Sequence, residues 1–287
     1  MKFRYSRMTS YLPLKKTIGL LVFSISFFQN CYFNPIVNGI LNPVEEKNDN
    51  SFLSLLGLGP GVSDLKITGQ IRNQYGTALA NLVLAPSPIS PQSKSILPPY
   101  TTDSGGRFYL PFQSGRISFV VSQNDSPLFT LSLDVLDPTS ITAEISGTSE
   151  LFEISNLGTM NGSESPSFFE LVRVFTLEGE SEVNIHNVNL GKAPNAIFLE
   201  FNEAPADVEP GNLSWAQNSV IISPAIGTGY LPSSIFGNQI PLMAIGEFTY
   251  SNVYTIDFTS NIKSASGNSL TPRRIKFCYS LPEACAY

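Results

Sequence analysis

Histidine, the side chain that acts most often as a general base, occurs once in this chain of 287 residues. Its one histidine, His186, lies in the alternating run of residues 183–188. A Ser-His-Asp arrangement would need this histidine as its base, and no Gly-x-Ser-x-Gly turn is present to display a nucleophile. We therefore expect His186 to be a structural or surface residue, and the protein to be no enzyme.

Acidic residues can act as catalytic pairs. Glycoside cleavage needs two carboxylates across a cleft, whereas Glu200 and Glu203 are only close in sequence. The alternation of residues 195–201 also directs Glu200 to solvent or to the sheet edge. We expect no catalytic acid pair.

Metal binding is the other chemistry that charged residues and cysteines could support. One histidine and two C-terminal cysteines cannot complete a tetrahedral zinc site. Two loop pairs offer oxygen atoms to calcium, Asp103 with Ser104 and Asp207 with Glu209, but neither has the spaced acidic pattern of a calcium loop. We interpret them as solvated turn residues, with calcium binding as the alternative, and expect no metal and no cofactor.

The first thirty residues have the order of a secretory signal. Five basic residues and no acidic one accompany an apolar run at 17–28, which ends at Gln29-Asn30-Cys31. A membrane-spanning helix needs roughly 20 apolar residues, so we favour export over a transmembrane anchor. Cleavage before Cys31 would leave 12 basic and 23 acidic residues, a formal charge of −11. Such an acidic chain has no general attraction to nucleic acid, and we expect no nucleic-acid partner.

Cys31 stands where the signals of bacterial lipoproteins are cut and acylated. Residues 28–31 (Phe-Gln-Asn-Cys) depart from the strict Leu-Ala-Gly-Cys pattern and resemble the permissive form of spirochaetal lipoproteins. Residues 34–51 resemble the tether of leptospiral lipoproteins. The resemblance implies an outer-membrane protein held by lipid on Cys31, on the surface or the periplasmic side. The alternative is a plain signal peptide with a chance cysteine.

Two further cysteines, Cys278 and Cys285, lie close together near the end of the chain. In an oxidising compartment they would form a disulfide, which we expect in the mature protein. So short a loop would pin the C-terminal tail and add little to global stability. The alternative is two free thiols.

From residue 65 onward the chain consists of short runs rich in Val, Ile, Phe, Tyr and Thr, separated by Gly, Pro, Asn, Asp and Ser. This texture predicts an all-β fold. The run 65–71 puts Leu65, Ile67 and Ile71 on one face, which predicts a half-buried strand. Residues 137–166 are rich in Ser, Thr, Gly and Asn and predict a domain boundary, unless residues 141–145 form the last strand of the first domain.

Four segments of the first part resemble, in order, the carboxypeptidase-regulatory-like (prealbumin-like) domain. They are residues 67–71 (Ile-Thr-Gly-Gln-Ile), 76–83, 102–108 (Thr-Asp-Ser-Gly-Gly-Arg-Phe) and 115–121 (Gly-Arg-Ile-Ser-Phe-Val-Val). A long proline-rich insertion follows Leu84. The resemblance covers roughly residues 65 to 137 and implies an accessory or spacer module without catalysis of its own.

Two segments of the second part resemble the bacterial Ig-like domain of the S-layer type. Residues 193–205 follow its opening pattern Pro-x-x-x-Ile-x-Ile-x-Phe, and residues 254–270 follow its closing pattern, which ends in Gly-Asn-x-Leu. Ser264 stands where the family often has Asp, and Ala204-Pro205 replaces the usual Pro-Met. The resemblance implies a second β-sandwich over roughly residues 190 to 280.

These features together predict two tandem β-sandwich domains after a signal peptide and a flexible tether. The predicted ranges are 1–30 for the signal peptide, 31–64 for the lipidated tether, 65–146 for the prealbumin-like sandwich, 147–166 for a linker and 167–287 for the Ig-like sandwich.

Residues 227–239 (GTGYLPSSIFGNQ) are the leading candidate for a binding loop. The stretch is too rich in Gly, Ser and Pro for a regular strand, yet it holds the large apolar residues Tyr230, Leu231, Ile235 and Phe236. Exposed apolar patches tend to mark contact sites, so we expect these four side chains to carry binding. The alternative is a loop packed over the end of the sandwich.

The sequence therefore predicts a non-catalytic cell-envelope lipoprotein that displays binding loops. Its expected partners are the membrane, through the N-terminal lipid, and a protein or glycan ligand. We expect adhesion or protein–protein interaction as its use. The alternative is a carbohydrate- or peptidoglycan-binding envelope module, which a row of aromatic side chains on one exposed face would favour.

Overall fold

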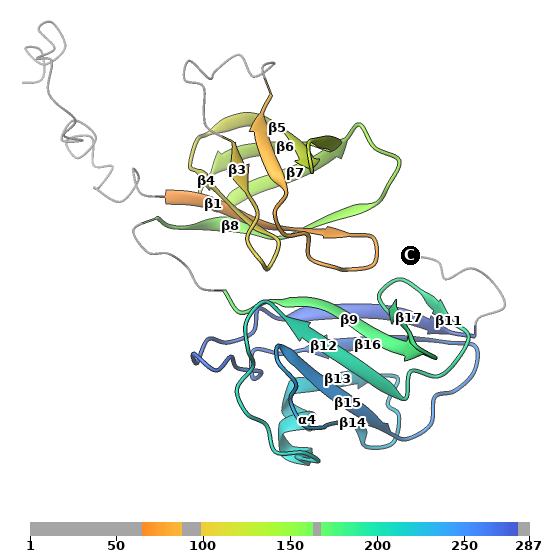
Figure 1. Ribbon diagram of the computed structural model, residues 1–287. Coiled ribbons are helices and arrows are strands. Elements are labelled where there is room, and N and C mark those ends of the chain that lie inside the picture. Colours follow the sequence, from red (N-terminus) through yellow and green to blue (C-terminus); the bar gives the residue numbers. More distant parts are fainter. Residues whose placement is uncertain (1–64, 88–98, 163–167, 281–287) are drawn as a thin grey trace, which may run out of the picture. The chain divides into compact units, whose positions relative to one another are not determined.

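The computed structural model describes residues 65–87, 99–162 and 168–280, so the expected signal peptide, tether and lipidated Cys31 lie outside the described residues. The all-β prediction is confirmed, because the described chain consists mainly of antiparallel strands with one short helix, α4 (Leu213–Ser219) (Figure 1). All described residues belong to one compact unit, residues 61–287.

The first sandwich packs a three-stranded sheet, in the order β4-β1-β8, against a five-stranded sheet, in the order β3-β2-β5-β6-β7. Alternate side chains of both sheets meet in one apolar core, to which β1 contributes Ile67 and Ile71 and β5 contributes Phe119. The strands are β1 (Leu65–Asn73), β2 (Val83–Pro86), β3 (Tyr100–Thr101), β4 (Arg107–Pro111), β5 (Gly115–Gln123), β6 (Ser126–Asp137), β7 (Ser140–Ser146) and β8 (Phe152–Asn161).

The linker expected over residues 147–166 instead contains β8. This strand pairs antiparallel with β1, from Asn73 opposite Phe152 to Leu65 opposite Asn161. Its Ser, Asn, Gly and Thr content suggested a connection, but β8 is an edge strand that packs Phe152, Ile154 and Leu157 against the core. Residues 141–145, which we kept open as a last strand, lie in β7 and pair with β6.

The second sandwich has a five-stranded sheet, in the order β10-β9-β12-β15-β14, and a four-stranded sheet, in the order β11-β17-β16-β13. Its core includes Phe201, Tyr254 and Phe277. The strands are β9 (Leu171–Glu178), β10 (Ser181–Asn184), β11 (Asn189–Leu190), β12 (Ala196–Phe201), β13 (Val220–Ser223), β14 (Gly229–Pro232), β15 (Gln239–Ile245), β16 (Asn252–Phe258) and β17 (Arg273–Tyr279).

Strand β1 is buried on both faces, which corrects the expectation of a half-buried strand. Ile67 and Ile71 point into the first core, as predicted. The alternate residues Thr68, Gln70 and Arg72 are also buried. Gln70 and Arg72 face residues 170–172 at the start of the second sandwich and are hydrogen-bonded to them.

Candidate functional site

The predicted binding loop contains a short strand, a connecting segment and a tight turn. Residues 229–232 form β14, which pairs with β15, so Tyr230 lies opposite Ala244. Tyr230 is 1 % exposed and belongs to the second core, and its hydroxyl donates to the carbonyl of Pro194 at 2.8 Å. Burial raises the pKa of this hydroxyl. Tyr230 is therefore a core residue, which corrects the expectation of an exposed contact residue.

The other three residues of the predicted site differ in exposure. Ile235 is half-buried and packs against the core, and Leu231 is half-buried on β14. Phe236 is 79 % exposed. Its backbone is fixed, because Phe236 and Gln239 exchange both N–H···O bonds, at 3.1 and 3.0 Å, around a turn in which Gly237 has φ +59°. Phe236 is thus a large apolar side chain presented to solvent on a closed hairpin.

Strand pairing places Phe236 on the same outer face of the five-stranded sheet as several other apolar residues. Ile240 and Leu242 of β15 point into the core, so Gln239, Met243 and Ile245 point outward. Directly paired residues share a face, which puts Phe236 with Gln239 and Leu231 with Met243. We call the outward apolar residues the apolar face: Leu177, Phe198, Leu231, Phe236, Met243 and Ile245.

One end of the apolar face is bordered by charged residues. Arg173 pairs with Glu182 at 2.7 Å and with Glu200 at 2.8 Å. Its guanidinium lies 4.4 Å from the ring centre of Phe175, which in turn stacks on Phe198 with 5.1 Å between ring centres. An apolar centre with a charged border is the usual arrangement of a protein–protein interface. Glu200 is thus half of an ion pair at this border.

The two sandwiches are joined by a buried polar network, which we call the joint: Gln70, Arg72, Arg107, Glu170 and Thr271. The Glu170 carboxylate accepts from Arg107 Nε at 2.5 Å, from Thr271 Oγ1 at 2.8 Å and from Gln70 Nε2 at 3.2 Å. Arg107 and Glu170 side chains are 3 % and 2 % exposed. Because the carboxylate has three donors, its burial is compensated.

Arg72 ties the joint to the backbone of both sandwiches. It donates to the carbonyls of Gly76 and Leu171 at 2.6 Å each and to that of Val172 at 3.2 Å. Burial, with the nearby charge of Arg273, lowers the pKa of Arg72 to about 9, so it stays charged at neutral pH. A backbone bond from Ala78 N to Val172 O at 2.8 Å adds to this connection.

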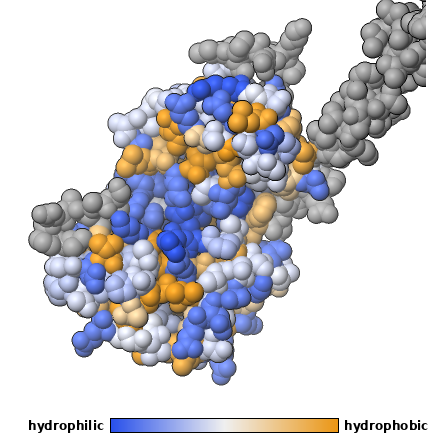
Figure 2. Space-filling view, turned by 180° about the vertical axis from the view of Figure 1, so that it is seen from behind, coloured by the Kyte–Doolittle hydropathy of each residue, from blue (hydrophilic) through white to orange (hydrophobic). Residues whose placement is uncertain are grey.

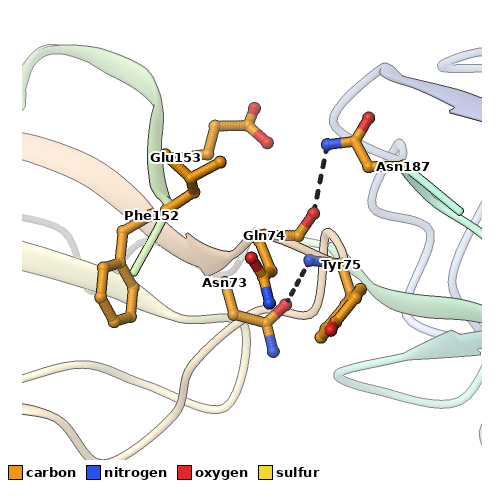
Figure 3. Close-up of a pocket in the computed structure, with 7 residues that line it drawn as sticks. Asn73, Gln74, Tyr75, Phe152, Glu153 and Asn187 are labelled. Carbon is orange, nitrogen blue, oxygen red and sulfur yellow. Dashed lines mark hydrogen bonds between the residues drawn. The ribbon is translucent and has the colours of Figure 1, made fainter. Parts of the chain in front are cut away.

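A pocket of about 500 Å³ opens next to the joint (Figure 3). We call it the Tyr75 pocket, and its lining residues are Asn73, Gln74, Tyr75, Leu151, Phe152, Glu153 and Asn187. They come from the end of β1 and the turn after it, from the start of β8 with the residue before it, and from the segment after β10. This site could not be predicted from the sequence, because these segments are far apart along the chain. Ligand sites occur preferentially where domains meet.

His186 lines a second hollow, together with Asn156 and Arg274 among others. Its Nδ1 accepts from the backbone N–H of Lys276 at 3.1 Å. Burial lowers the pKa of His186 to about 4, and Arg273 and Arg72 contribute to this against the opposing charge of Glu153. His186 is therefore neutral at physiological pH and is held by the backbone, which agrees with a structural position.

Figure 2 shows the molecule from behind, where hydrophilic residues gather in a central band.

The acidic residues considered for catalysis or calcium make local contacts. Asp103 Oδ1 accepts from the backbone N–H groups of Gly105 and Arg107, and its Oδ2 accepts from Tyr109. Glu203 accepts from Asn268 and Ser266. Asp207 and Glu209 are exposed. Among the described residues, no group of three or more His, Cys, Asp or Glu side chains is placed to hold a metal.

Cys278 is disulfide-bonded and completely buried on β17. The chain has two other cysteines, Cys31 and Cys285, and both lie outside the described residues. The pairing of Cys278 with Cys285 stays a prediction.

In the part of the chain that the structure describes, no helix has the length and hydropathy needed to cross a membrane. The resemblances to the prealbumin-like and Ig-like families stay predictions based on the residues quoted for them. No model of a known protein family matches the chain, and no curated protein is significantly similar to it.

Proposed function

We propose that this protein is a non-catalytic, exported lipoprotein of the outer membrane that binds another protein through the apolar face. The observation that carries the proposal is Phe236, 79 % exposed on a hairpin whose backbone is closed by two hydrogen bonds. The sequence supports export and anchoring through its basic start, apolar run and Cys31.

The apolar face has the composition expected of a contact surface. Leaving several large apolar side chains next to one another in water is unfavourable, and such patches on soluble proteins mark interaction sites. Phe236, Met243 and Ile245 are all exposed, on neighbouring segments of one sheet. Aromatic residues and Met are enriched at the centres of interfaces, where they fill pockets of the partner.

The fold supports binding by a preformed surface. The backbone under the apolar face is a continuous antiparallel ladder through β9, β12, β15 and β14, which lie side by side in Figure 1. A surface held in this way loses little conformational entropy on binding. Adhesion to a host or envelope protein is the use we propose.

A binding screen tests the proposal. The full chain is immobilised and exposed to matrix, plasma and envelope proteins, and the dissociation constant of each captured protein is measured. Replacement of Phe236 by Ser should weaken the binding roughly tenfold or more, because a central aromatic anchor is lost. Leu136→Ser is the matched control, since Leu136 on β6 is equally exposed and lies in the first sandwich. Equal effects of the two variants would contradict the assignment of the apolar face.

Anchoring is tested separately. Fatty-acid labelling of cells that express the protein should label the wild type and not Cys31→Ser. Unchanged labelling of the variant would refute lipidation at Cys31 and leave the binding proposal intact.

A further inference from the structure

The Tyr75 pocket combines fixed walls, free amide groups and exposed apolar side chains. It lies in a different place from the apolar face, so the inference drawn from it does not depend on the proposed function. Its volume of about 500 Å³ is within the range of small-molecule sites.

Internal hydrogen bonds hold the walls of the pocket in place. Asn73 Oδ1 accepts from the backbone N–H groups of Tyr75 and Thr77, both at 3.0 Å, which fixes the turn that carries Tyr75. Asn187 Nδ2 donates to the Gln74 carbonyl at 3.1 Å and so links the two sandwiches across the pocket (Figure 3). Phe152 packs against Phe129 of the first core with the two rings tilted by 38°, and the ring centres are 4.5 Å apart. A ligand would therefore find a preformed site.

The charge of the pocket is already balanced. Glu153 binds Arg273 through both of its oxygen atoms, at 2.5 and 2.6 Å. Burial alone would raise the pKa of Glu153, but the bonds and the charge of Arg273 outweigh it and lower this pKa. The carboxylate stays ionised and paired, so the pocket has no uncompensated charge to select a charged ligand.

Neutral amide groups remain available to a ligand. Among the described residues, Asn73 Nδ2, Asn187 Oδ1 and the side-chain amide of Gln74 make no hydrogen bond. They offer donors and acceptors together, which is what hydroxyl groups need because each hydroxyl both donates and accepts. The ring of Tyr75, which is 44 % exposed, and the side chain of Leu151, which is 69 % exposed, add apolar surface at the same opening.

The edge of β8 that faces β1 is not available for strand addition, whereas its outer edge is the edge of the sheet. Asn73 pairs with Phe152, and Arg72 pairs with Glu153, in the ladder between β1 and β8. An extended peptide that binds by main-chain hydrogen bonds needs an unpaired strand edge. The free side-chain amides lie beside an aromatic ring on which the C–H face of a sugar ring can pack.

We propose that the Tyr75 pocket binds a neutral saccharide. Tyr75 supplies the apolar platform, and Asn73, Gln74 and Asn187 bind the hydroxyl groups. The unpaired amide groups and the exposed ring at one opening are the observations that point to this class of ligand.

Titration of the full chain with neutral oligosaccharides tests the proposal. The probes are β-linked glucose and N-acetylglucosamine oligomers of two to six units, and the measurement is isothermal titration calorimetry. Saturable binding should be seen with one of these series, and Tyr75→Ala should weaken it about tenfold, the loss of an aromatic contact of roughly 1.4 kcal/mol. Asn187→Ala should weaken it as well.

Two controls keep the outcome clear. Tyr250→Ala removes another exposed tyrosine, one that lies in the second sandwich, and should leave saccharide binding unchanged. Thermal unfolding of each variant checks that it is folded. The absence of saturable binding to both series at millimolar concentration, or equal affinity of wild type and Tyr75→Ala, would overturn the proposal. If the protein instead captured a peptide from a random library, and this capture were lost in Tyr75→Ala, the ligand class would be a peptide and the saccharide proposal would be wrong.

Discussion

Arg107 and Glu170 form an ion pair between the two sandwiches, with Arg107 Nε 2.5 Å from Glu170 Oε1 and both side chains almost completely buried. The two residues are 63 positions apart along the chain. Arg107 also lies over the ring of Phe168, 3.9 Å from its centre. The pair therefore connects the start of β4 with the first residues of the second sandwich.

Breaking this pair should be costly. Replacing Glu170 with Gln leaves Arg107 buried without a countercharge, and we expect a loss of about 3 to 5 kcal/mol in the free energy of unfolding. Arg107→Met should have a similar effect. The double variant should lose clearly less than the sum of the two, because neither charge is then unpaired. Urea unfolding measures all three.

An exposed ion pair gives the control for that cycle. Arg116 pairs with Glu144 on the surface of the first sandwich, where both side chains are more than half exposed. Arg116→Ala should leave the stability nearly unchanged, because water already solvates these charges. If Glu170→Gln were as mild as Arg116→Ala, the joint would not hold the two sandwiches together.

His186 should make stability depend on pH. Its pKa is lowered to about 4 in the folded protein, whereas the unfolded chain has the ordinary value of 6.5. Between these values the unfolded state binds more protons, so stability falls as the pH is lowered from 6.5 to 4. The full shift corresponds to roughly 3 kcal/mol, which partial exposure reduces to about 2 kcal/mol.

Urea unfolding at pH 7 and pH 4.5 measures this loss. The replacement His186→Gln removes the titrating group, so the variant should lose less stability over this range than the wild type. Equal losses in the two proteins would show that His186 does not contribute to the pH dependence.

Gly106 should tolerate no side chain. It has φ +74°, and a Cβ atom there would lie 2.8 Å from the carbonyl oxygen of Ile71 and 2.9 Å from the backbone nitrogen of Leu79. We expect Gly106→Ala to cost more than about 2 kcal/mol, from strain and from displacement of the backbone. Gly179→Ala separates the two effects, because Gly179 has a similar φ of +67° with nothing within 4 Å. That variant should lose only about 1 kcal/mol.

Cys278 should form its disulfide bond with Cys285. Cys278 is disulfide-bonded, and the chain has only two other cysteines. Acylation of Cys31 would leave Cys285 as the one partner. A non-reducing peptide map of the mature protein should therefore contain one linked peptide with Cys278 and Cys285. A link between Cys278 and Cys31 would contradict both the pairing and the lipidation.

The all-β fold could be predicted because its signal is local. Alternating apolar residues and turn residues are read within a few positions, and they correctly placed Ile67 and Ile71 in the core. The burial of Gln70 and Arg72 could not be predicted in this way. Polar residues on alternate positions of a strand usually face solvent, and here the partners that bury them are about 100 residues away.

The candidate site was predicted only in part. Phe236 is exposed as expected, but Tyr230 is in the core, because β14 finds its partner strand β15 across the hairpin. Met243 and Ile245 were missed. Strand β15 has apolar residues on both faces, Ile240 and Leu242 inward and Met243 and Ile245 outward, and this is a signal that the sequence does carry. The Tyr75 pocket has no such signal, since it needs the second sandwich to complete it.

Footprinting of the bound protein is the most direct test of the apolar face as the binding surface. Hydroxyl radicals modify exposed Phe, Met, Leu and Tyr side chains, and mass spectrometry compares the free chain with the chain bound to its captured partner. Phe236 and Met243 should lose reactivity on binding, while the exposed residues Leu136 and Tyr250 should keep theirs. Protection of Leu136 or Tyr250, with Phe236 and Met243 still fully reactive, would contradict the proposed function.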